Sequence, residues 1–323
     1  MKVILETAPK ETCPYFNDIA RCDEYDKVDG YDENDGDDDE NEDDMYQGLA
    51  LPTAMVMQNS SELHLSFAGC GFLGTYHVGV IQCLMTHGKG FMKRIRGVGG
   101  ASAGALVAAF MICSPKKLND GMQLCYDVAD TIQSKPLGAL TPNFSVSRTL
   151  HSELDRLLPP NAHTMASGRL FISLTMLSNR KNIMISQFEN RDELIQALLC
   201  SCHIPVYSGM QTPIFRGKKC MDGGMSWNQP AMPSAKTIFV SPFCGSKQQI
   251  CPSDETWFDL SYDIFGHSFK VSALNVVRGV QALFPPHRSV LEKYYHKGVQ
   301  DARVFLFKNQ LYEHELETDL ELE

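Results

Sequence analysis

Apolar segments alternate with helix-periodic segments along residues 62–312, and this alternation predicts an α/β domain. Residues 63–69, LHLSFAG, are apolar and bounded by glycine, as is typical of a buried strand. Residues 72–88, FLGTYHVGVIQCLMTHG, carry apolar side chains at helical spacing. Residues 95–113, IRGVGGASAGALVAAFMIC, repeat the order with a second strand, a tight turn and a strongly apolar helix.

The rest of the domain continues the pattern and predicts a mainly parallel sheet covered by helices on both faces. Further strands are expected at residues 169–177, 182–188 and 236–243, and further helices at 115–134, 146–158, 191–201, 271–284 and 289–301. Within the helix at 271–284, a stripe of apolar residues has helical spacing: Leu274, Val277, Val280 and Phe284. We expect this stripe to pack into the core, with lipid contact as the alternative.

The glycine loop between the first strand and helix fits two chemistries. Gly69, Gly71 and Gly74 have the spacing G-x-G-x-x-G of a dinucleotide-binding turn. Such a site needs a carboxylate about 20 residues later, at the end of the second strand, to bind the ribose. The second strand ends instead in GVGGASAGA, which carries no carboxylate. We therefore favour a loop whose backbone N–H groups stabilise an acyl oxyanion.

The turn after the second strand predicts a nucleophile. Gly100, Ser102 and Gly104 satisfy G-x-S-x-G, in which a serine projects from a sharp strand-to-helix turn. An α/β-hydrolase places several strands before this turn. Here only one strand and one helix precede it, which argues against that fold. A candidate base lies further on, in Asp222-Gly223-Gly224, although Asp-Gly alone is more typical of an ordinary turn.

The overall net charge of −10 is unevenly distributed along the chain, with acidic segments on both sides of a basic body. Residues 23–44 hold 14 acidic residues and one lysine, and residues 313–323 add −6, which leaves +9 on residues 45–312. We expect the acidic stretch 23–44 to be disordered, because it cannot bury enough apolar surface. We hypothesise that it competes with anionic lipid for the basic body, with a role in solubility alone as the alternative.

Composition narrows the cellular context. No stretch approaches the roughly 18 consecutive apolar residues of a membrane-spanning helix. The N-terminus has only a brief apolar run, which argues against a secretory signal. The 11 cysteines are scattered without a C-x-x-C pair, which favours reduced thiols in the cytoplasm over a disulfide framework or metal site.

Three motifs in this order and spacing, GCGFLG, GASAG and DGG, resemble the patatin-like phospholipases and acyl hydrolases. The segments LSFAGCGFLGTYHVGV and CHIPVYSGMQTPIFRGKKCMDGGMSWNQP resemble the branch that contains adiponutrin and adipose triglyceride lipase. The ending QALFPPHRSVLEKYYHKGVQDARVFL is similar to the shortest members of that branch. The resemblance implies the three-layer patatin fold over residues 62–312. An N-terminal arm, 1–61, and an acidic tail, 313–323, flank this catalytic domain.

The resemblance also implies a Ser–Asp dyad without histidine. Ser102 is the expected nucleophile and Asp222 the base. Backbone N–H groups of the glycine loop are the expected oxyanion donors: Gly69, Cys70, Gly71 and Phe72. We expect His77 to serve in packing, whereas His203 and His267 matter only if a triad exists.

The implied function is hydrolysis of lipid acyl esters such as triacylglycerol, retinyl ester or phospholipid, with possible transacylation. The alternative is a catalytically silent lipid-binding protein of the same fold. We expect no metal or organic cofactor and no nucleic-acid partner. The expected location is cytoplasmic, peripheral on membranes or lipid droplets.

Overall fold

The structure, a computed structural model, describes residues 62–142, 144–254 and 260–314. The predicted disordered stretch 23–44 and the end of the acidic tail lie outside the described residues. The first half of the domain contains β1 (Leu63–Phe67), η3 (Gly71–Leu73), α2 (Gly74–His87), α3 (Lys89–Lys93), β2 (Ile95–Gly100), α4 (Ala103–Cys113), η4 (Pro115–Lys117), α5 (Leu118–Gln133), η5 (Gly138–Leu140), α6 (Val146–Leu157) and α7 (Ala162–Ala166). The second half contains β3 (Leu170–Met176), β4 (Asn182–Ile185), α8 (Arg191–Ser201), β5 (Ile214–Phe215), β6 (Lys218–Asp222), η6 (Gly223–Met225), β7 (Lys236–Val240), β8 (Ser261–Ile264), β9 (His267–Lys270), α9 (Ala273–Leu283) and α10 (Arg288–Lys308).

A seven-stranded sheet forms the centre of the domain. Four strands run parallel in the order β3-β2-β1-β7, while β4 and β6 pair antiparallel with β3 and β5 pairs antiparallel with β6. The strand β1 is buried along its whole length and has parallel neighbours on both edges, as is typical of a central strand in an α/β sheet. The predicted α/β class with a mainly parallel sheet is confirmed.

Two strands meet head to head beside β3, and this junction positions the candidate site. The strand β2 pairs in parallel with the first half of β3 and ends where Gly100 lies opposite Ile172. The strand β6 pairs antiparallel with the second half and ends where Asp222 lies opposite Leu174. Because β4 pairs with both Ile172 and Leu174, it occupies the other edge of β3. The ends of β2 and β6 therefore face each other along one edge.

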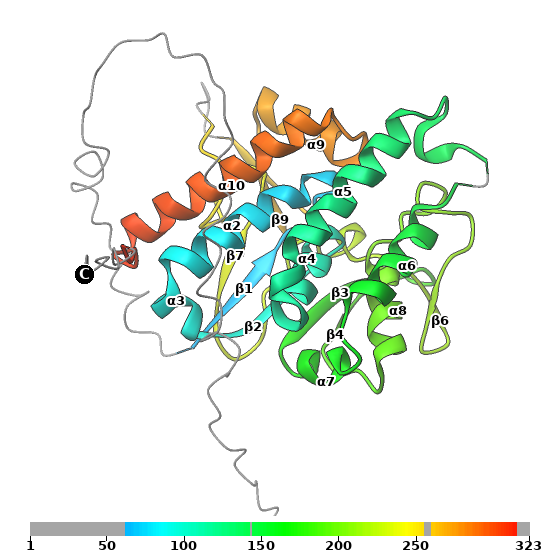
Figure 1. Ribbon diagram of the computed structural model, residues 1–323, viewed down its shortest axis with the longest axis horizontal. Coiled ribbons are helices and arrows are strands. Elements are labelled where there is room, and N and C mark those ends of the chain that lie inside the picture. Colours follow the sequence, from blue (N-terminus) through cyan, green and yellow to red (C-terminus); the bar gives the residue numbers. More distant parts are fainter. Residues whose placement is uncertain (1–61, 143, 255–259, 315–323) are drawn as a thin grey trace, which may run out of the picture. The chain divides into compact units, whose positions relative to one another are not determined.

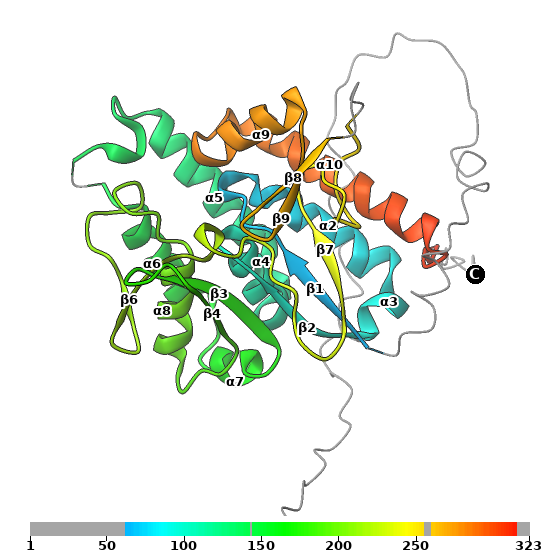
Figure 2. The same ribbon diagram turned by 180° about the vertical axis from the view of Figure 1, so that it is seen from behind.

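Helices α2 and α4 connect the parallel strands and lie in front of the sheet in Figure 1. Seen from behind, β1, β2 and β7 come forward with the β8–β9 hairpin (Figure 2). The long helix α10 runs alongside α2 in both views and packs against it. Every helix and strand expected from periodicity is present, with shifts of a few residues at most ends and a longer α10.

Four features escaped the sequence analysis: the β5–β6 hairpin, the β8–β9 hairpin and the short helices α3 and α7. One expectation was wrong. The stripe on α9 does not pack into the core, because Leu274, Val277, Val280 and Phe284 are all exposed.

Candidate active site

The turn from β2 to α4 holds Ser102 in a backbone conformation that few residues adopt. Ser102 has φ 53° and ψ −129°, and it caps the N-terminus of α4. Such strain amounts to about 1–3 kcal/mol and persists only where the surroundings impose it. A Cβ on Gly100 or Gly104 would lie only 2.4 or 2.3 Å from the Phe67 carbonyl oxygen of the neighbouring strand β1. The two glycines therefore allow the turn from β2 to α4 to pack against β1.

The end of β6 brings Asp222 to this turn. Its side chain is 5% exposed and accepts a hydrogen bond of 2.7 Å from the Gly224 N–H. Burial raises the pKa of Asp222 to about 6, while hydrogen bonds from the Ser102 side chain and the Gly224 backbone act in the opposite direction. Asp222 is thus a buried carboxylate in contact with the Ser102 hydroxyl.

The glycine loop lies between Ser102 and α9. Gly71 has φ 53°, and a Cβ there would lie 2.0 Å from the Ala282 carbonyl oxygen, so only glycine fits. The Gly69 N–H donates to the Asn228 carbonyl oxygen at 3.2 Å. The N–H groups of Gly71 and Phe72 open the helical segment formed by η3 and α2, where the first amides have no partner within the helix. These two amides and that of Cys70 are therefore the candidate oxyanion donors, whereas the Gly69 amide is engaged by Asn228.

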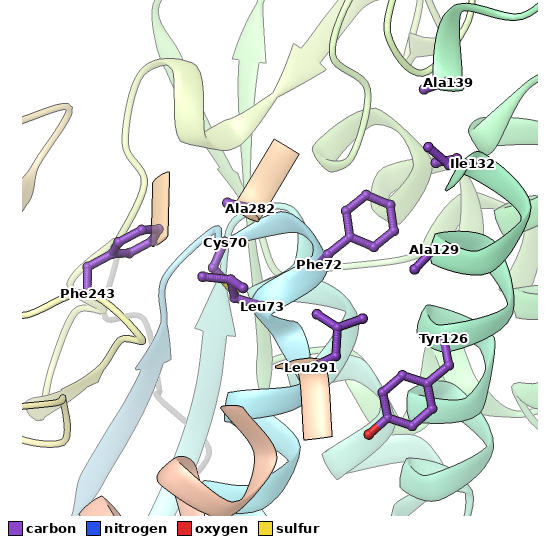
Figure 3. Packing of buried hydrophobic residues seen from close by; sticks show 10 residues of the cluster. All are labelled: Cys70, Phe72, Leu73, Tyr126, Ala129, Ile132, Ala139, Phe243, Ala282 and Leu291. Carbon is purple, nitrogen blue, oxygen red and sulfur yellow. The ribbon is translucent and has the colours of Figure 1, made fainter. Parts of the chain in front are cut away.

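Figure 3 shows the side chains around this loop. Phe72 points toward α5, where Ala129 and Ile132 face it, and Ala282 of α9 lies beside Cys70. Burial raises the pKa of the Cys70 thiol well above its usual value, so this cysteine stays protonated. The expected backbone role of Cys70 agrees with that environment.

Two supporting residues were missed by the sequence analysis. The Ser201 hydroxyl accepts a hydrogen bond from the Ser102 N–H at 2.9 Å and donates to the Ser173 carbonyl oxygen of β3 at 2.8 Å. Asn228 donates through Nδ2 to the Gly69 carbonyl oxygen at 3.2 Å. Serine and asparagine are common in loops, so no local motif distinguishes these two. Ser201 ties the turn at Ser102 to the sheet, and Asn228 ties the glycine loop to the segment after β6.

The two histidines considered for a triad, His203 and His267, have other environments, and so does His77, which was expected to serve in packing. The ring of His267 lies between Asn228 and Ser241, and burial lowers its pKa to about 3. His77 Nε2 lies 2.9 Å from the Ala68 carbonyl oxygen, and burial lowers its pKa to about 4. His203 contributes its carbonyl oxygen, which accepts the Asp222 N–H at 2.8 Å.

An apolar cavity of about 170 Å³ extends from Ser102. Its walls come from α2, α4, α5 and α6, and α9 contributes Ala282 and Leu283. The remaining lining is mainly apolar, including Val78, Leu106 and Phe110, with hydroxyl groups from Thr75, Tyr207 and Ser208. A cavity of this kind accepts a hydrocarbon chain and offers few groups that bind a polar one.

Comparison with known proteins places the chain in a family. A family model described as "Patatin-like phospholipase" matches residues 65–234. The human "Patatin-like phospholipase domain-containing protein 4" is 38% identical over 78% of this chain and 99% of its own length. The chain belongs to the patatin-like phospholipase family. This membership confirms the resemblance drawn from the motifs and the expectation of an enzyme that hydrolyses lipid esters.

Other patatin relatives are longer. The human "1-acylglycerol-3-phosphate O-acyltransferase PNPLA3" is 40% identical over 75% of this chain and 50% of its own length. The human "Omega-hydroxyceramide transacylase" is 35% identical over 75% of this chain and 45% of its own length. The chain thus spans about half of these two relatives. Among the residues described here, no helix is long and apolar enough to cross a bilayer.

Proposed function

We propose that this patatin-like chain hydrolyses lipid acyl esters through a Ser102–Asp222 dyad. The observation that carries the proposal is the junction of β2 and β6, which sets a strained serine against a buried carboxylate. That carboxylate has a pKa of about 6, so it is mostly ionised near neutral pH and still basic enough to accept a proton.

The chemistry follows from these contacts. The Ser102 hydroxyl attacks the ester carbonyl as Asp222 takes its proton, and the Gly71, Phe72 and Cys70 amides stabilise the oxyanion. Asp222 returns the proton to the departing alcohol, which leaves an acyl-Ser102 ester. Water, activated by Asp222, releases the fatty acid and regenerates the hydroxyl. An acceptor alcohol in place of water gives transacylation.

The cavity supports a substrate with a long hydrocarbon chain. Its mainly apolar lining begins at Ser102, so an acyl chain held there places its carbonyl carbon at the nucleophile. The candidate substrates are triacylglycerol, retinyl ester and phospholipid. Because two relatives are named as an acyltransferase and a transacylase, acyl transfer to an alcohol is part of the proposal.

The proposed catalytic domain spans residues 62–312, with residues 1–61 and 313–323 as flanking arms. These substrates reside in membranes and lipid droplets, so we place the enzyme peripherally on such surfaces from the cytoplasmic side. The silent lipid-binding alternative lacks support from the site, because such a protein has no need of a strained serine in contact with a buried carboxylate.

A panel of radiolabelled lipid esters, tested on the purified full chain, distinguishes these functions. We expect hydrolysis of at least one lipid class, with Ser102→Ala lowering the rate by about 10⁴-fold or more. Asp222→Asn keeps the shape of the side chain and removes its basic charge, so its activity should collapse as well. Turnover by Ser102→Ala comparable to that of the unsubstituted chain would contradict the dyad.

A further inference from the structure

The helix α9 has its polar side turned inward. Its buried positions are Asn275, Arg278 and Ala282, which are three and four residues apart and so share one face. In a helix packed on a protein core this face is normally apolar. The apolar residues of α9 must therefore lie on its outward side.

Hydrogen bonds and an ion pair hold α9 in this orientation. The Arg278 guanidinium donates to both carboxylate oxygens of Asp254, at 2.7 and 2.9 Å. Asn275 donates to the carbonyl oxygens of Cys244 and Lys270 at 2.7 and 2.8 Å and accepts from the Cys244 N–H at 3.0 Å. Rolling the helix to bury its apolar face would break all these contacts. The outward face is thus a fixed feature of the fold.

The outward face is apolar and uncharged. Its large side chains are Leu274 (54% exposed), Val276 (67%), Val277 (47%), Val280 (55%), Leu283 (42%) and Phe284 (67%). The exposed positions of residues 273–284 also include Ala273 and Gly279, and they include no charged or polar residue. A soluble protein rarely exposes a continuous apolar surface of this kind unless something covers it.

The location of α9 indicates what covers this face. The Ala282 backbone lies against Gly71 of the proposed oxyanion loop, and Ala282 and Leu283 line the cavity that begins at Ser102. One side of the C-terminal turn of α9 therefore belongs to the cavity, and the other belongs to the exposed face. A lipid surface in contact with α9 would be adjacent to the site that receives an acyl chain.

We propose that the outward face of α9 is the surface through which the protein docks on zwitterionic lipid, with its side chains in the layer between head groups and acyl chains. This inference rests on the proposed lipid hydrolase function and names its docking element. Because the face carries no charge, docking through it does not depend on anionic lipid. The basic body of the chain plays a secondary part on such a surface.

The test measures flotation of the full chain with phosphatidylcholine vesicles. We expect binding that persists in high salt and that falls at least about tenfold in Val276→Asp/Val280→Asp, because each charge must enter the interfacial layer. The control is Leu177→Asp, which puts one of the two added charges on an exposed apolar residue in the turn after β3, and it should bind normally. A milder variant, Val276→Ser/Val280→Ser, should bind at an intermediate level.

Activity separates docking from catalysis and folding. Hydrolysis of a water-soluble short-chain ester should be equal in the unsubstituted chain and in all three variants, whereas hydrolysis of emulsified triacylglycerol should follow vesicle binding. Absence of soluble-ester hydrolysis in the unsubstituted chain would count against the proposed function, while flotation would still test docking.

Three results would overturn the docking proposal: equal flotation of the aspartate double variant and the Leu177→Asp control, loss of binding in high salt, or burial of this face in a dimer. Light scattering of the unsubstituted chain and the aspartate variant detects the last case, because only a dimer formed through α9 would dissociate on substitution.

Discussion

The pKa of Asp222 predicts a specific loss of activity in acid. Burial raises this pKa from 3.8 to about 6, so the carboxyl gains its proton as the pH falls through that value. Protonated Asp222 cannot accept the Ser102 proton. With a pKa of about 6, the ionised fraction is about 90% at about pH 7 and about 10% at about pH 5. We therefore expect kcat/KM to fall roughly tenfold between these pH values. An aspartate with the ordinary pKa of 3.8 would lose only about 6% over the same interval.

The assay uses a water-soluble short-chain ester, which avoids any effect of pH on lipid docking, and reads product at a wavelength independent of its ionisation. The profile should keep its acid limb in His203→Gln and in His267→Gln, because neither ring takes the proposed proton. The reasoning is refuted if activity is flat down to about pH 5, or if the limb disappears in either histidine variant. Either result would mean that a buried Asp222 is not the base.

Three further substitutions test other parts of the structure. Ser201→Ala removes the acceptor for the Ser102 N–H, and we expect roughly fivefold lower kcat on the soluble ester with little change in KM, measured by initial rates. Gly121→Leu adds a side chain to the wall of the apolar cavity, so kcat/KM for long-chain esters should fall while that for short-chain esters stays level. Arg278→Ala leaves the buried Asp254 carboxylate without its partner, and thermal or urea unfolding should show a loss of about 3–5 kcal/mol. An unchanged kcat in Ser201→Ala would contradict the positioning role of Ser201. An unchanged kcat/KM for long-chain esters in Gly121→Leu would contradict binding of the acyl chain in the apolar cavity. An unchanged stability in Arg278→Ala would contradict the anchoring of α9 by its ion pair.

Local patterns were sufficient for the parallel part of the fold. The segment before Gly69 is apolar and the one after it has helical period, and the same sequence of signals recurs around Ser102, so β1-α2-β2-α4 could be predicted. The β5–β6 hairpin could not be predicted, since β6 begins with two lysines and its pairing with β3 is non-local. That pairing is what carries Asp222 to Ser102, so the dyad came from family resemblance and not from local sequence.

Ser201 and α9 show a second limit of prediction from the sequence alone. Ser201 acts through a hydrogen bond to a residue 99 positions away, and no spacing rule reveals such a contact. For α9, periodicity correctly gave a helix with an apolar face but not the direction of that face. The direction is set by Asn275 and Arg278, whose partners Cys244, Lys270 and Asp254 lie in loops and a hairpin outside the helix.

The most direct test of the account is covalent labelling with a fluorophosphonate, which traps a nucleophilic serine as fluoride departs. Peptide mass spectrometry of the labelled full chain should locate one adduct, on Ser102. Labelling should be absent in Ser102→Ala, strongly slowed in Asp222→Asn and unchanged in His203→Gln. Labelling of Ser102→Ala at the rate of the unsubstituted chain, or rapid labelling of Asp222→Asn, would contradict the Ser102–Asp222 dyad.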